Sequence, residues 1–175
     1  MTDGRPQRIL VAGFGNELRG DDGFGIAVID ALGRGEPLPP EFRCVEVGTA
    51  GLHLVGELFD GYSGLIVVDA VDRGGPAGTL YVLEVQVPSA AELSQTAQHA
   101  LAVDMHEAVP DRALMVAAAA GALPARVYLV GCQTAITEDF CTELSEPVRA
   151  AVPRAADAVR SLLENWRTHD EAVRG

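Results

Sequence analysis

The chain has 175 residues, of which 48% are apolar and 22% charged, a composition typical of a folded domain rather than of a disordered chain. Its 13 basic residues, all arginine, stand against 25 acidic ones, which leaves a formal charge of −12. This charge argues against nucleic-acid backbones and anionic membranes as partners, and the lack of lysine excludes a P-loop lysine and a lysine Schiff base.

The sequence shows no signal for secretion or membrane insertion. Its first residues lack the apolar core of a signal peptide, and no apolar run reaches the ~18 residues of a membrane-spanning helix. The three cysteines, Cys44, Cys132 and Cys141, lack C-x-x-C spacing, which predicts reduced thiols rather than a disulfide framework or a zinc site. We therefore expect a cytoplasmic protein without membrane contact.

The first predicted elements alternate strands with helices. Arg8–Gly13 is an apolar run of strand length, and Phe24–Leu32 then repeats apolar residues at helical spacing. Arg43–Gly48 predicts a second strand and Leu52–Phe59 a short helix. This order is typical of parallel strands covered by helices.

The later elements begin with the most apolar strand. Gly64–Val71 is expected at the centre of the sheet, whereas the partial alternation in Thr79–Val85 predicts an edge strand. After a polar stretch the sequence predicts a helix, the last strand and a final amphipathic helix, over Ala108–Ala120, Arg126–Gly131 and Glu143–Arg167.

Together these elements predict an α/β fold. We expect a three-layer α/β/α sandwich with a mostly parallel five-stranded sheet, whose fourth strand is an antiparallel edge. The sequence has no internal repeat, so we expect one domain over residues 1–175 with a core over about 7–165. The last residues, Thr168–Gly175, are expected to fray.

Polar residues follow the carboxyl ends of the predicted strands, where open α/β sheets bind their ligands. Asp22 lies in the loop after the first strand, and Asp69 ends the third. The loop after the fourth strand contains three further candidates, His99, Asp104 and His106. Two carboxylates and one imidazole form a donor set for a hard to borderline divalent metal.

Each of these residues also has a structural interpretation. Asp22 precedes a helix and could be only a capping or first-turn charge, and His106 could be a surface or capping histidine. Asp69 is harder to explain in this way, because a carboxylate at the end of a buried strand is costly without a partner. Cys132 has no base nearby in sequence, so we expect a structural thiol.

Four motifs, in order along the chain, together resemble those of the hydrogenase maturation proteases, the endopeptidases that trim the C-terminus of nickel–iron hydrogenase large subunits. The motifs are ILVAGFGNELRGDDGFG at residues 9–25, GTAGL at 48–52, LIVVDAVD at 65–72 and VYLVGCQ at 127–133. The resemblance extends over about residues 7–165.

This resemblance implies that Asp22, Asp69 and His106 contact a metal, and that the two aspartates are the catalytic residues. Some relatives have glutamate where this chain has Asp22. His106 is preferred to His99 because its spacing to the next helix and strand matches the family, whereas His99 would require seven extra residues.

The resemblance also implies residues that contact the substrate. Glu46 stands where many relatives carry an aspartate implicated in substrate handling, so the role is either kept by a longer side chain or lost. The candidate substrate contacts are Glu46, Gly48, Thr49 and Asn16. Candidates for positioning the loop or the substrate are Glu17, Asn16 and Asp21.

The expected reaction is removal of a C-terminal peptide from the nickel-loaded precursor of a hydrogenase large subunit. The substrate supplies the nickel, and an incomplete three-ligand site gains affinity when the ion is shared. We expect a monomer that meets this precursor transiently. The sequence does not decide whether Asp22, Asp69 or the metal activates water.

Two other functions fit parts of the sequence. A peptidyl-tRNA hydrolase-like enzyme shares the glycine–x–glycine–asparagine turn, but it needs a basic groove for tRNA, which a charge of −12 disfavours. A nickel-checking assembly chaperone would bind the precursor without cutting it, and Glu46 in place of the usual aspartate keeps this alternative open.

Overall fold

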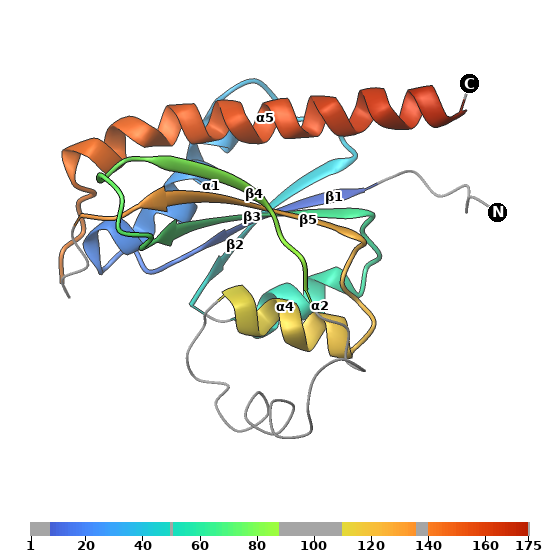
Figure 1. The fold of residues 1–175 in the computed structure, drawn as a ribbon, viewed down its shortest axis with the longest axis horizontal. Helices are drawn as coiled ribbons and strands as arrows, with labels where there is room; N and C mark the ends of the chain where they lie inside the picture. The colour runs from blue at the N-terminus through green and yellow to red at the C-terminus, as the bar shows by residue number, and fades with distance from the viewer. Residues whose placement is uncertain (1–7, 50, 88–109, 136–139, 175) are drawn as a thin grey trace.

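The computed structural model describes residues 8–49, 51–87, 110–135 and 140–174. Its five-stranded sheet has the order β2-β1-β3-β5-β4 (Figure 1). The strands are β1 (Ile9–Phe14), β2 (Phe42–Gly48), β3 (Gly64–Val71), β4 (Leu80–Glu84) and β5 (Arg126–Gln133). All neighbouring pairs are parallel except β4–β5, which is antiparallel. The expected α/β fold with a mixed, mostly parallel sheet is confirmed.

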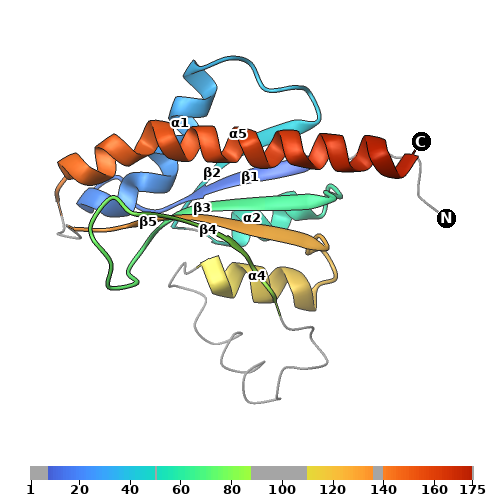
Figure 2. The same ribbon diagram turned by 45° about the horizontal axis from the view of Figure 1, so that its top comes forward.

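Helices cover both faces of this sheet (Figures 1 and 2). One face carries α1 (Phe24–Arg34), which follows the 3₁₀ turn η1 (Gly20–Gly23), and the long α5 (Glu146–Arg174). The opposite face carries α2 (Gly51–Leu58) and α4 (Pro110–Ala119). The chain therefore forms three layers, with the sheet in the middle.

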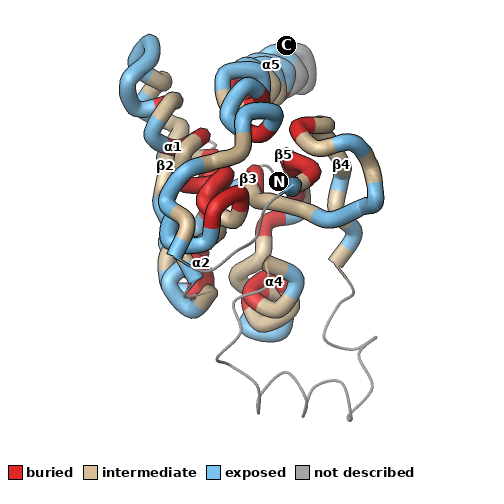
Figure 3. Tube along the Cα trace, turned by 90° about the vertical axis from the view of Figure 1, so that its left-hand side faces the viewer, coloured by how far each residue is buried: buried red, intermediate tan, exposed pale blue. Residues whose placement is uncertain are grey.

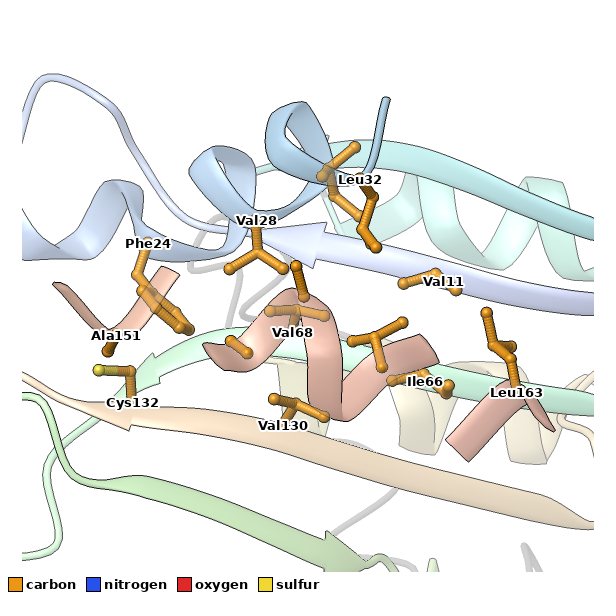
Figure 4. Close-up of a cluster of buried hydrophobic side chains, with 14 of the residues drawn as sticks. Val11, Phe24, Val28, Leu32, Ile66, Val68, Val130, Cys132, Ala151 and Leu163 are labelled. Carbon is orange, nitrogen blue, oxygen red and sulfur yellow. The ribbon is translucent and has the colours of Figure 1, made fainter. Parts of the chain in front are cut away.

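The central strand β3 supplies both cores because its side chains alternate between the faces of the sheet. Ile66 and Val68 face α1 and α5, whereas Leu65 and Val67 face α2 and α4, and all four are buried. Figure 3 shows the buried residues gathered along the sheet and the inner sides of the helices, and Figure 4 shows the α1–α5 side of β1, β3 and β5. Burial on both faces explains why Gly64–Val71 is an almost continuous apolar run.

The last helix is longer than the sequence predicts. Fraying was expected from Thr168 onward, but α5 continues to Arg174. Its anchor is Trp166, whose ring lies edge-on to Tyr128 at 5.5 Å and so close to Gly64 that an added Cβ there would be 3.0 Å from it. A helix held so firmly near its end needs only the ordinary propensity of the following residues to continue by another turn.

Candidate active site

Asp22 and Asp69 lie within electrostatic reach of each other, near the carboxyl ends of β1 and β3 and the switch point between these strands, which we call the crevice. The chain leaves β1 toward β2, whereas it leaves β3 toward β4 on the other side of the sheet. Parallel sheets bind ligands at such switch points, outside the carboxyl ends of the strands. The pairing of β1 with β3 stops at Gly13–Val68, so Asp69 is the first residue of β3 beyond this pairing, although it still pairs with Gly131 of β5.

The loop after β1 folds back tightly against η1. Gly15 has a φ of 125°, and a Cβ at this position would collide with the carbonyl oxygen of Asp22. The Gly15 N–H also donates to the carbonyl oxygen of Gly48, at the end of β2, over 3.1 Å. Only glycine combines this backbone conformation with such a close approach, so Gly15 brings the first loop, η1 and the end of β2 together.

Asp22 turns its carboxylate toward this loop. Its Oδ2 accepts a hydrogen bond of 3.1 Å from the Asn16 N–H, and the Asn16 side chain accepts one of 2.9 Å from the Leu18 N–H. The residue at the start of α1 is Gly23, which makes no side-chain cap. Asp22 therefore does not cap α1, but it is an acid in the first turn of η1, the other structural role that the sequence allowed. The residue remains partly exposed.

Among the described carboxylates at this edge of the sheet, Asp69 has the most strongly shifted pKa. Burial raises its pKa from 3.8 to about 7, although a 2.9 Å hydrogen bond from the Ala70 N–H lowers the pKa in part. The negative charges of Asp22 and Asp111 raise the pKa further. The structure thus brings Asp22 and Asp69 within electrostatic reach of each other.

A hollow of about 450 Å³ opens beside the crevice, at the ends of β1 and β2. All four candidate substrate contacts line it, namely Asn16, Glu46, Gly48 and Thr49. The Glu46 side chain is exposed and Gly48 has a φ of 61°, which ends β2 in a turn. Asn16 and the three residues at the end of β2 are 30 or more positions apart in sequence, yet they line the same hollow.

A second hollow, of about 410 Å³, has Asp69 in its wall. Its apolar side is formed by Val67, Leu114 and Leu129, and Asp111 stands at its edge. The sequence interpretation missed Asp111. The signal was an acid directly after Pro110, but an acid in the first turn of a helix is normally explained by the helix dipole alone.

Gln133, which ends β5, was also missed as an organising residue. Its buried side-chain oxygen accepts hydrogen bonds from the N–H groups of Arg73 and Gly75, and its amide nitrogen donates to Asp72. This one side chain therefore fixes the turn between β3 and β4, next to the second hollow. Its position at the end of the last family motif was the available signal.

The histidine of the predicted donor set cannot be placed. His106, its alternative His99 and Asp104 all lie outside the described residues. Within the described ranges, no group of three or more His, Cys, Asp or Glu side chains is arranged to hold a metal ion.

The buried thiol at the site edge is protonated at neutral pH. Burial raises the pKa of Cys132 to about 11, and the charge of Asp21 adds to this shift. Such a thiol is a poor nucleophile, as expected for a structural cysteine.

The helices in the described part of the chain are each too short or too polar to cross a membrane.

Comparisons with known proteins agree on one family. A family model described as hydrogenase maturation protease matches residues 26–162. The hydrogenase expression/formation protein HupM of Azotobacter chroococcum mcd 1 is 37% identical over 166 residues, which cover 94% of this chain and 75% of that protein. HupD of Rhizobium leguminosarum bv. viciae is 34% identical over 160 residues, which cover 91% and 75%.

Solved structures lead to the same group. A hydrogenase 2 maturation peptidase from Thaumarchaeota archaeon SCGC_AB-539-E09 has a TM-score of 0.68 and 36% identity, with 90% of this chain and 99% of that chain covered. The hydrogenase-maturating endopeptidase HybD of E. coli has a TM-score of 0.72 and 25% identity, with 91% and 93% covered.

Proposed function

The chain belongs to the hydrogenase maturation protease family, and from this premise we propose that it removes a C-terminal peptide from the nickel-loaded precursor of a nickel–iron hydrogenase large subunit. The observation that supports the proposal is that the charge of Asp22 acts on Asp69, near the ends of the adjacent strands β1 and β3. Because the chain belongs to this family, we prefer this reaction to the peptidyl-tRNA hydrolase-like alternative.

Asp22 and Asp69, joined by His106, bind the nickel that the precursor already holds. Two like charges close together disfavour each other, and a divalent cation between them relieves this repulsion. Three ligands leave positions open for the ligands of the precursor. The enzyme thus distinguishes loaded from empty precursor by the free energy of the shared coordination.

The hollow beside the crevice receives the precursor chain near the metal. Asn16, Gly48 and Thr49 offer polar groups there, and Glu46 offers an exposed carboxylate in the role for which many relatives use aspartate. Asp22 and Asp69 are the candidates for the base that activates water, and the nickel can polarise the scissile carbonyl. The cleaved peptide then leaves.

We expect Asp22→Ala, Asp69→Ala and His106→Ala each to fold and to lose trimming of nickel-loaded precursor by at least about 100-fold, since each removes a ligand or a proton acceptor. The measurement is the mass of the precursor after incubation with each variant, with nickel-free precursor in parallel. Asp60→Ala and His53→Ala, at exposed positions away from both hollows, are the matched controls and should trim normally.

Other outcomes would identify specific errors. Full activity of His106→Ala together with an inactive His99→Ala would show that the histidine assignment is wrong. Wild-type protein that binds nickel-loaded precursor and leaves its mass unchanged would support the non-cleaving chaperone instead.

A further inference from the structure

The two acids of the Asp21–Asp22 pair face in opposite directions. Asp22 is partly exposed at the crevice and accepts from the Asn16 N–H. Asp21 is fully buried, at 0% exposure, on the inner side of η1. An ionised side chain is rarely buried so completely unless the fold uses it.

Asp21 joins η1 to two positions that follow 114 and 124 residues later in the chain. Its Oδ2 accepts a 2.7 Å hydrogen bond from the Ala135 N–H and a 2.9 Å bond from the Ser145 hydroxyl, and its Oδ1 accepts a 2.7 Å bond from the Ser145 N–H. Hydrogen bonds to a carboxylate are stronger than those between neutral groups. We name this arrangement, Asp21 with Ala135 and Ser145, the Asp21 clamp.

The Asp21 clamp connects the two halves of the proposed catalytic pair. Ala135 lies two residues after Gln133, which pairs with Val71, and Val71 lies two residues after Asp69. The turn that carries Asp22 is therefore tied to the strand pair that carries Asp69. The Gly20 N–H, which donates to the carbonyl oxygen of Cys141, holds the same turn at a second point.

From this geometry we infer that Asp21 is a positioning residue for the reaction: it sets the place of Asp22 relative to Asp69. The inference rests on the proposed function for its effect on catalysis, but not for its effect on geometry. Without the Asp21 clamp, η1 keeps the hydrogen bond to the first loop but loses the hydrogen bond from the Ala135 N–H, just after β5.

The Asp21 clamp requires a carboxylate rather than an amide. Each oxygen of Asp21 faces a backbone N–H, of Ala135 on one side and of Ser145 on the other. An asparagine must turn its NH₂ group toward one of these donors in either orientation, so one backbone N–H loses its acceptor. Asp21→Asn is therefore a nearly isosteric substitution that opens one side of the clamp.

We expect Asp21→Asn to lower kcat for nickel-loaded precursor roughly 10- to 100-fold, because displacing a reacting group by about 1 Å costs up to that much. KM should change by less than about threefold, since the substrate hollow is lined by other residues. In an NMR spectrum the Asn16 amide signal should shift, because its acceptor, Asp22, has moved. A loss of global stability alone would leave that signal of the folded protein in place.

Asp30→Asn is the matched control. The Asp30 carboxylate is on the surface of α1, where it pairs with Arg34 at 2.6 Å. The same chemical change there should leave both kcat and the Asn16 amide signal unchanged. A folded Asp21→Asn variant with unchanged kcat and an unchanged Asn16 signal would overturn the inference.

Ser145→Ala provides the second variant if Asp21→Asn does not fold. It removes only the hydroxyl donor and leaves both N–H donors in place, so the Asn16 signal should shift in the same direction by less. An unshifted signal would overturn the inference. If wild-type protein leaves the precursor intact, the proposed function fails, and the Asn16 signal still decides the role of Asp21.

Discussion

Burial in the fold disfavours the ionised form of the Asp69 carboxyl group. Burial at the end of β3 raises its pKa to about 7, and the nearby charges of Asp22 and Asp111 contribute to the shift. An unfolded chain would leave the same carboxyl at its ordinary value of 3.8. Residues kept in unfavourable states commonly belong to functional sites, because selection for activity outweighs their cost in stability.

We therefore expect Asp69 to weaken the fold as the pH rises. Its folded pKa is raised, so its contribution to stability is complete below about pH 4 and is lost as the pH rises through about 7. Asp69→Asn should raise the free energy of unfolding at pH 8 by up to about 4 kcal/mol, with little change at pH 4. Urea unfolding at both pH values measures this difference, and an equal effect at both would contradict the pKa assignment.

At the scale of elements, the close packing of α1 against the sheet positions the turn η1, which carries Asp21 and Asp22. Gly25, in the first turn of α1, lies against the backbone, and a Cβ there would collide with the carbonyl oxygens of Phe14 and Val68. Phe14 ends β1, and Val68 is the last residue of β3 that pairs with β1. Asp22 is three residues before Gly25. The close packing of α1 on the sheet therefore also affects the distance between Asp22 and Asp69.

Two glycines of α1 should respond to the same substitution in opposite ways. Gly25→Ala should destabilise the protein by about 1 to 3 kcal/mol or more, because the helix must move off the sheet. Gly33→Ala has no atom within 4 Å of the new Cβ and should stabilise by about 0.5 to 1 kcal/mol through helix propensity. Urea unfolding gives both values. Equal effects of the two substitutions would show that α1 does not pack so closely against β1 and β3.

At the scale of the whole molecule, two cores share one sheet. The α1–α5 side contains Trp166, the single tryptophan of the chain, and the α2–α4 side contains Leu54. Neighbouring residues of β3 point into both cores, so neither side can lose its packing without disturbing the strands of the other. This coupling supports the proposal of one domain.

A substitution on one side should thus be detected on the other. We expect Leu54→Ala to lower the free energy of unfolding by about 2 to 5 kcal/mol, and to shift the Trp166 fluorescence transition as far as the far-UV circular dichroism transition. A Trp166 transition that stays at its wild-type midpoint would show that the two sides unfold separately, against a single domain.

The elements could be predicted from the sequence because their signals are local. A strand buried on both faces, such as Gly64–Val71, must be apolar along its length, and a helix on one face must repeat apolar residues every three or four positions. The same reasoning proposed Asp22 and Asp69, because Asp22 follows β1 and Asp69 lies near the carboxyl end of β3. It misjudged the end of α5, where the packing of Trp166 against Tyr128 and Gly64 anchors the helix.

By itself, then, the sequence determined the layered fold, the family and the edge of the sheet that carries the acids. Only the tertiary structure decided which acid of the Asp21–Asp22 pair faces inward, and that Asp111 approaches Asp69. The physical reason is distance along the chain: Asp21 finds its partners 114 and 124 residues away. A hydrogen bond between such remote positions leaves no pattern in the residues around either end.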